Sequence, residues 1–421
     1  MLFTAQIVSL LGSGLATVAL GLLAYELSGG RASVVLGALF AVKMLAYVVV
    51  APVAAAALRS LPRRSVMVAS DLVRVAVALA LPFVAHTWQI FALVFVLQAA
   101  SAAFIPTYQA TLPAVLTDED EYTGALSLSR LVEDLETIGS PLLAALLLVF
   151  LPVHDLFFGT AIGFAASALL VLSVNLPARA GLSRPPQDEP ERPWGEHARA
   201  GILLFFRTAS LRPILLLNLV VAASVAYVLV QTVVIVRGEL GLSDQWVALF
   251  LAINGVGAIA AASTLGPLLD RVGERRLMLG AAVGLVVLTA VVGVIVSVEA
   301  TPTVQGGAIA AAWLAIGAAW VWVETPMGRI IRRATLTPDP DQGQLLDQAY
   351  AAQFSLSHAC WLLTYPLVGL LGQVGLGVAA WVMAGVAALA AVAATIVWPM
   401  SLADHSTRHL KGKLTDESPT R

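Results

Sequence analysis

The sequence predicts an all-α membrane protein with twelve transmembrane helices in two pseudo-symmetric six-helix halves. Composition supports this first, because 59% of the 421 residues are hydrophobic and only 12% are charged, against about a quarter charged in soluble domains. Mean hydropathy is +0.88. Apolar runs of about 20 residues, the length that crosses a bilayer, recur along the chain. A polar, proline-containing segment then divides these runs into two groups of six.

Charges, prolines and glycines set the limits of each expected helix. The expected spans are 3–27, 34–57, 66–85, 89–112, 124–151, 156–176, 211–235, 245–269, 277–298, 304–327, 348–371 and 376–399. The chain then divides into an N-terminal half, a cytoplasmic linker that ends in a surface helix, a C-terminal half and a cytoplasmic tail, namely 1–176, 177–208, 209–399 and 400–421.

The distribution of Lys and Arg predicts the orientation. Only Arg31 and Arg237 lie in loops on one side, whereas nearly all other Lys and Arg lie in loops, helix ends and the tail on the other side. Because positive residues favour the cytoplasmic side, both termini are expected in the cytoplasm. A net charge of −2 argues against a nucleic-acid partner. The expected partners are the lipid bilayer, a small-molecule substrate and protons, and the chain is expected to be a monomer.

A short basic segment, Gly266–Arg276, separates two long uncharged runs. Its residues are Gly-Pro-Leu-Leu-Asp-Arg-Val-Gly-Glu-Arg-Arg. Gly266 permits close helix approach, Asp270 can accept hydrogen bonds from a neighbouring helix N-terminus, and Gly273 permits a tight turn. The arginines that hold the turn on the positive side are Arg271, Arg275 and Arg276. The segment resembles the loop motif of the major facilitator superfamily, which implies a conformational latch between the second and third helix of a half.

The corresponding turn of the first half departs from that motif. Leu58 and Leu61 stand where the motif has Asp and Gly, although the basic residues Arg59, Arg63 and Arg64 remain. An acidic latch is therefore expected in the second half only.

Four further segments carry a narrower similarity: Ser9–Gly14, Tyr25–Gly29, Asp71–Arg74 and Ile138–Leu142. Together they resemble the drug-exporting branch of the superfamily, which includes macrolide and enterobactin exporters. The resemblance implies export across a bacterial inner membrane.

Charges inside the spans need a reason, because insertion of each costs at least about 2.5–3.5 kcal/mol at mid-bilayer. Lys43 stands alone in the second span, either as a substrate or proton-linked group or as the partner of a buried acid. Asp71 and Arg74 lie one turn apart in the third span, where we favour a stabilising pair that supports the hinge.

The fifth span holds the strongest candidates for proton coupling. Arg130 can neutralise Glu133 or Asp134, one turn away, which leaves Glu136 deeper in the span and without a partner within a turn. A buried carboxyl of this kind can bind and release a proton near neutral pH. A structural charge network near the inner face is the alternative. His358 in the eleventh span and Lys43 complete the candidates.

In the superfamily fold, the first, fourth, seventh and tenth helices line a central cavity. The residues that these helices offer here are Gln6, Ser9, Ser13, Phe91, Phe95, Gln98, Asn218, Tyr227, Gln231, Trp313 and Trp320. Aromatic groups with scattered amides suit amphipathic organic molecules. For each single aromatic, plain helix packing is the alternative.

The sequence contains no P-loop, nucleophile elbow or zinc-ligand spacing, so we expect no enzyme, no cofactor and no metal site. The favoured function is proton-coupled export of small amphipathic compounds. The alternatives are export of a transition-metal ion or metal chelate such as a siderophore, suggested by the fifth-span acids with His358, and a membrane scaffold without transport activity.

Overall fold

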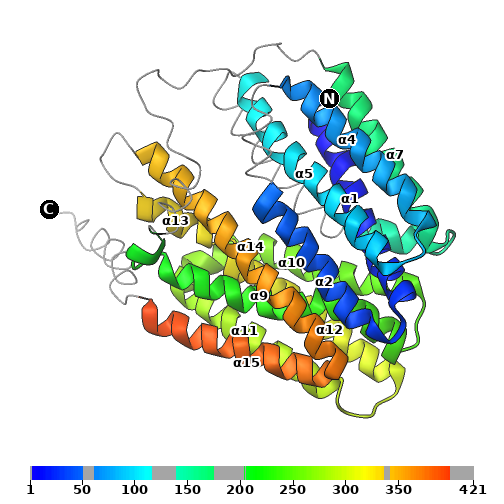
Figure 1. The fold of residues 1–421 in the computed structure, drawn as a ribbon. Helices are drawn as coiled ribbons and strands as arrows, with labels where there is room; N and C mark the ends of the chain where they lie inside the picture. Colours follow the sequence, from blue (N-terminus) through cyan, green and yellow to red (C-terminus); the bar gives the residue numbers. More distant parts are fainter. Residues whose placement is uncertain are drawn as a thin grey trace, which may run out of the picture.

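The chain folds into a bundle of long helices (Figure 1). Apolar runs become helices because a bilayer offers the backbone no hydrogen-bond partners, so each N–H and C=O must be bonded within the chain. The structure, a computed structural model, describes residues 2–50, 61–115, 139–174, 203, 205–335 and 342–398. These residues contain ten stretches long and apolar enough to cross a membrane, the first of which, Leu2–Val50, holds two helices.

The helices fall into an N-terminal and a C-terminal set. The N-terminal set is α1 Leu2–Ser28, α2 Ala32–Leu45 with a π-helical continuation Ala46–Val50, α4 Arg63–Ala80, α5 Thr87–Val115, helical residues 139–147, and α7 Val153–Ser173. The C-terminal set is α9 Arg212–Val233 with a π-helical continuation Val234–Glu239, α10 Asp244–Val272, α11 Glu274–Ile295, α12 Pro302–Glu324, α13 Met327–Thr335, α14 Gln342–Val374 and α15 Leu376–Val397.

The all-α class predicted from the sequence is confirmed, and most boundaries agree within a few residues. The span expected at 304–327 is an exception, because α12 ends at Glu324 and Pro326 precedes a separate short helix, α13. Most of the fifth span and of the linker expected at 177–208 lies outside the described residues.

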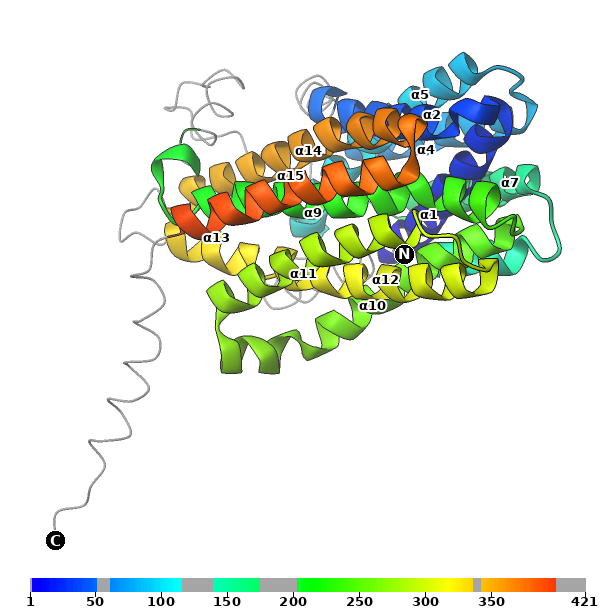
Figure 2. The same cartoon turned by 90° about the horizontal axis from the view of Figure 1, so that it is seen from below.

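The two sets repeat one packing pattern (Figures 1 and 2). In the N-terminal set α1 packs on α7, and α4 packs on α5 and α7. In the C-terminal set α9 packs on α15, and α11 packs on α12 and α15. The pseudo-symmetry expected of the two halves therefore has a counterpart in the packing of the described helices.

The helices alternate in direction, so the bundle has two ends. We call the end with the α10–α11 turn the Gly273 end and the end with the α14–α15 turn the Gly375 end. Gly273 has φ +80°, which glycine adopts without a steric penalty, and its N–H donates to the Leu269 carbonyl at 2.9 Å. The tight turn predicted here is confirmed.

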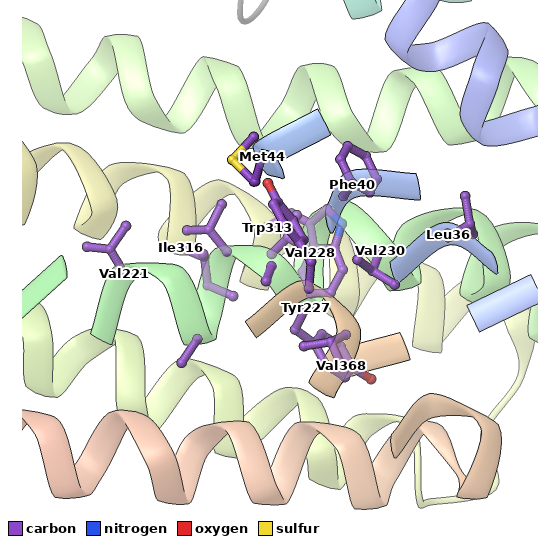
Figure 3. Close-up of a cluster of buried hydrophobic side chains, with 14 of the residues drawn as sticks. Leu36, Phe40, Met44, Val221, Tyr227, Val228, Val230, Trp313, Ile316 and Val368 are labelled. Atoms are coloured by element: carbon purple, nitrogen blue, oxygen red, sulfur yellow. The ribbon is translucent and has the colours of Figure 1, made fainter. Parts of the chain in front are cut away.

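The hydrophobic core runs across both sets. Helix α2 of the N-terminal set packs on α14 of the C-terminal set, and α14 also packs on α9. Figure 3 shows that Leu36, Phe40 and Met44 of α2 share one buried cluster with Tyr227 of α9 and Trp313 of α12. In the described part of the chain, the α2–α14 contact is therefore the most extensive contact between the two sets, beside smaller ones of α9 with α1 and α2.

Candidate functional site

The backbones of α2 and α14 touch at two glycines. A Cβ atom added at Gly37 would lie 2.5 Å from the Tyr365 carbonyl oxygen and 2.8 Å from the Gly369 Cα. A Cβ atom at Gly369 would lie 2.7 Å from the Ser33 carbonyl oxygen and 3.1 Å from the Gly37 Cα. These distances leave no room for a side chain, so glycine at both positions permits the contact.

Buried amide and hydroxyl groups join the same helices near the Gly375 end. Ser33 Oγ donates to Gln231 Oε1 at 3.0 Å, and Gln231 Nε2 donates to the Val368 carbonyl at 3.0 Å. Tyr227 donates its hydroxyl to the Leu376 carbonyl at 3.0 Å. Gln231 and Tyr227, which were expected to line a cavity, hold α2, α9, α14 and α15 together in this structure.

Other expected cavity residues are also packed. Trp313 is fully buried, donates Nε1 to Thr232 Oγ1 at 2.8 Å, and meets the Tyr227 ring edge-on at 6.4 Å. Asn218 is buried on α9. Trp320 is half-buried and donates Nε1 to Glu324.

Helix α14 carries a line of aromatic rings toward α2 and α12. Phe354, His358, Trp361 and Tyr365 follow one another at spacings of four, three and four residues, which places them on one helix face. We call these four residues the aromatic stripe. Of these four residues, only His358 was a candidate from the sequence, although the spacing alone would have revealed the other three.

Ring contacts show which residues of α2, its continuation and α12 lie beside the aromatic stripe. Phe40 of α2 stacks on Tyr365 with ring centroids 5.0 Å apart, and Tyr47 lies 5.9 Å from His358. Trp320 of α12 lies 6.5 Å from Trp361. The aromatic stripe therefore bridges the two sets of helices.

His358 donates from Nδ1 to the Phe354 carbonyl at 2.7 Å, because a carbonyl oxygen can only accept. In the neutral imidazole, Nε2 is then the nitrogen that accepts a proton. Lys43 lies on α2, four residues before Tyr47, whose ring contacts His358. Two of the five proton-coupling candidates therefore lie on helices that pack on one another, α2 and α14.

Lys43 also lines a small cavity between α1, α2 and α5, together with Thr17, Phe40 and Gln98. The cavity measures about 20 Å³, room for about one water molecule. This cavity is too small for an organic molecule.

The remaining cavity candidates of the first half lie on α1 and α5. Gln6 and Ser9 are buried, Ser13 and Phe91 are half-buried, and Phe95 is 39% exposed.

Asp71 and Arg74 form a fully buried ion pair inside the N-terminal set. Arg74 donates from Nη1 to Ser9 Oγ at 2.9 Å, and Ser167 donates to Asp71 Oδ2 at 2.8 Å. The Cζ atom of the Arg74 guanidinium lies 4.4 Å from the ring centroid of Phe104 and 4.4 Å from that of Phe164. The pair ties α4 to α1, α5 and α7, which favours a packing role over the expected hinge role.

The expected latch residues lie at the surface of the Gly273 end. Asp270 is exposed and accepts no hydrogen bond within the part of the chain that the structure describes. Arg271 and Arg276 are exposed, and Arg275 is half-buried. No atom of the described residues lies within 4 Å of a Cβ atom added at Gly266, so the close helix approach expected there is not found among them.

The close approaches of α10 lie deeper in the helix. A Cβ atom at Gly257 would overlap the Leu314 carbonyl of α12, and one at Gly317 would overlap the Asn254 carbonyl of α10. Small residues at these two positions let α10 and α12 pack backbone to backbone.

Glu274 makes the ion pairs at this end that the sequence analysis missed. It pairs with Arg333 and, at 3.3 Å, with Arg329, and so joins the start of α11 to α13. Glu274 occupies a variable position of the motif, which is why the motif gave no signal for it.

Several candidates lie outside the described residues. They are Arg59 of the first hinge and the fifth-span acids Glu133, Asp134 and Glu136. The neighbouring Arg63 and Arg64 begin α4, and Arg64 donates to the Leu172 carbonyl. Among the residues that are described, no group of three His, Cys, Asp or Glu is arranged to hold a metal ion.

Comparison with known proteins agrees with this architecture. Residues 2–335 match the family described as Major Facilitator Superfamily. The uncharacterized MFS-type transporter YfiS of Bacillus subtilis (strain 168) is 24% identical over 226 residues, which are 53% of this chain and 52% of that relative. The match therefore spans about half the length of this curated relative.

Solved transporters share the fold over nearly the whole chain. The nucleoside transporter NupG superposes with a TM-score of 0.71 at 12% identity, covering 94% of this chain and 98% of that one. The D-xylose-proton symporter superposes with a TM-score of 0.67 at 14% identity, covering 94% and 97%. Since the family match covers most of the residues and the fold agrees, the chain belongs to the major facilitator superfamily, whose members are membrane transport proteins.

Proposed function

We propose that this protein is a secondary active transporter that exports small amphipathic organic compounds in exchange for protons. The observation that carries the proposal is the aromatic stripe on α14, which faces α2 across the contact between the two sets. Its apolar ring faces suit an organic molecule, its member His358 can accept a proton at Nε2, and Lys43 lies on the facing helix α2.

Alternating access follows from the construction of the Gly375 end. The contact there is made by glycine backbones, the stacked rings of Phe40 and Tyr365 and a few hydrogen bonds, which separation of its two sides would break. We infer that this conformation is closed at the Gly375 end, and that the protein works by opening that end and closing the other.

The distribution of arginines supports an orientation with the Gly273 end in the cytoplasm. The described arginines of this end include Arg212, Arg271, Arg276 and Arg333, whereas Arg31 and Arg237 lie at the Gly375 end. We infer that the protein lies in the inner membrane of a bacterium with both termini in the cytoplasm. We further infer that it acts as a monomer of two halves, 1–176 and 209–399.

Glu136 is our first candidate for the proton carrier, followed by Glu133, Asp134 and His358. The placement of Asp71 beside Arg74 supports this order, because it removes one membrane acid from consideration. Export of a metal ion or metal chelate is the second candidate function. It depends on the same fifth-span acids acting with His358.

Growth of an efflux-deficient bacterial host that expresses the chain separates these functions. Amphipathic export predicts survival on toxic organic compounds and no change on nickel, cobalt or iron plates. Protection against the metals alone would overturn the proposal in favour of metal export. Protection against neither class, by protein shown to be present in the membrane, would also contradict it.

A further inference from the structure

We propose that a groove on the outside of the C-terminal set binds one acyl chain of an anionic phospholipid, with the lipid phosphate beside Arg276. The groove lies away from the contact between the two sets. The inference therefore goes beyond the proposed function and does not depend on which compound the protein carries.

The groove arises from the way in which three helices meet. Helices α10 and α11 touch each other little beyond the turn that joins them, whereas both pack extensively on α12. Figure 2 shows these three helices along the lower margin of the bundle, away from α2, α4 and α5. The space left has a volume of about 430 Å³ and is lined by residues within 276–288 of α11 and 315–322 of α12, with Val272 of α10. We call it the α11–α12 groove.

Small residues keep the groove open. Gly280 and Gly284 line it one turn apart on α11, and Ala315 and Ala318 line it from α12. A Cβ atom added at Gly280 or Gly284 would meet no described atom within 4 Å, unlike one added at the glycines where α10 touches α12. Glycine weakens a helix by about 1 kcal/mol relative to alanine. The two glycines of α11 therefore leave room for a ligand where no described helix requires their small size.

The side chains around the groove place it against the hydrocarbon of the bilayer. Val283 and Val287 of α11 are each 53% exposed, and Leu314 of α12 is 42% exposed. Both helices belong to stretches long and apolar enough to cross a membrane. Exposed apolar side chains on such helices contact lipid chains, and a void beside them loses dispersion contacts unless a chain enters it.

The length of the groove suits a lipid of one leaflet. Arg276 and Leu288 are twelve residues apart, which is about 18 Å along a helix that rises 1.5 Å per residue. Half of a hydrocarbon core of about 30 Å is about 15 Å. A chain anchored at the Gly273 end can therefore lie along the groove for its whole length.

The charge at the Gly273 end of the groove favours an anionic headgroup. Arg276 lines the groove there and is exposed. Three arginines and two acids lie between positions 270 and 276, and one of these acids, Glu274, is paired with Arg333 and Arg329. Positive charge is thus in excess, and a guanidinium can donate two hydrogen bonds to one phosphate.

A photoreactive lipid tests both the chain and the headgroup. The full chain is reconstituted into phosphatidylcholine liposomes that contain a trace of phosphatidylglycerol or phosphatidylcholine with a diazirine in its palmitoyl chain. After irradiation, mass spectrometry locates the attached lipid. We expect attachment within 276–288 and 315–322, with a yield from phosphatidylglycerol about fivefold that from phosphatidylcholine. This factor corresponds to about 1 kcal/mol for one arginine near an anionic surface.

Variants separate the two parts of the site. Arg276→Gln should bring the ratio of the two yields close to one, and Arg276→Lys, which keeps the charge, should preserve the preference. The double change Gly280→Leu, Gly284→Leu fills the groove and should abolish attachment of either lipid there. Gly385→Leu is the matched control, because it adds the same side chain at an exposed glycine of α15 with no described atom within 4 Å of its Cβ. It should leave attachment in the groove as in the wild type.

Three outcomes overturn the inference. Equal yields from the two lipids on the wild-type protein would remove the anionic headgroup. Attachment that persists in the double leucine variant would place the chain elsewhere. Lipid attached only to other helices would leave the groove to another occupant, such as a second copy of the chain or a carried compound.

Discussion

Replacement of Gly37 by alanine is expected to weaken closure of the Gly375 end. The added Cβ would lie 2.5 Å from the Tyr365 carbonyl oxygen, whereas carbon–oxygen contacts ordinarily measure about 3.3–3.6 Å. Helices α2 and α14 therefore have to move apart by about 1 Å to admit it. Gly369→Ala should act in the same direction, because its Cβ would lie 2.7 Å from the Ser33 carbonyl.

The size of the effect follows from the cost of overpacking. Inserting a methyl group into a close contact costs about 1–3 kcal/mol, and this cost falls only on the closed state. The ratio of closed to open molecules should then fall by about 5- to 150-fold. Alanine also favours the helix by up to about 1 kcal/mol, but this gain applies to both states and cancels in the ratio.

Pulsed electron paramagnetic resonance between two spin labels measures the ratio directly. His86 and Glu299 are exposed at the Gly375 end and belong to opposite sets of helices, so they are suitable sites. The single native cysteine, the buried Cys360, is first replaced by alanine. Gly37→Ala should move population from the short to the long distance.

A matched control separates the contact from the change of residue type. Gly385→Ala in α15 adds the same methyl group at a position where no atom of the described residues lies within 4 Å of the added Cβ, so its distance distribution should equal that of the parent. If Gly37→Ala gives the parent distribution as well, the α2–α14 contact does not close this end and our reasoning about the gate is wrong.

Three further predictions concern charged residues. Glu136→Gln should abolish uphill proton-driven efflux in vesicles while substrate binding and downhill exchange persist; full uphill efflux would move the search to the other candidate acids. Asp270→Asn should slow interconversion of the two states, seen as a lower transport rate at nearly unchanged substrate affinity; an unchanged rate would remove the latch role. Asp71→Ala should lower stability by about 3–5 kcal/mol because it leaves Arg74 buried without its partner, and the double change Asp71→Leu, Arg74→Met should recover part of this loss. Thermal unfolding in detergent tests the last prediction, and equal Tm values for all three proteins would refute it.

Most helices could be predicted because membrane insertion depends on local composition. Runs such as 376–399 match their helices closely, and α15 spans Leu376–Val397. The break between α12 and α13 was missed because the expected span 304–327 was continued past Glu324 and Pro326. The residue before a proline is disfavoured in the helical conformation, so α12 ends at Glu324 and a separate helix begins at Met327.

The candidate site was harder to predict because it depends on which helices become neighbours. Lys43 and His358 were each singled out as polar groups in a membrane span, but the packing of their helices, α2 and α14, depends on contacts far apart in the sequence. The glycine contacts between helices could not be predicted either, because the sequence around Gly37 is that of any small residue in an apolar helix. The burial of Trp313 and Tyr227 could not be predicted either. Their burial depends on closure of the Gly375 end, and so on the conformation as well as on the sequence.

Transport by the purified protein in liposomes tests proton-driven export most directly. The compound identified by the growth assay is supplied on one side, a pH gradient is imposed, and both the compound and the lumenal pH are followed. We predict that the compound accumulates against its own gradient, that protons move in the opposite direction, and that a protonophore stops both. Accumulation that continues unchanged after the pH gradient has collapsed, or compound movement without proton movement, would contradict the proposed mechanism.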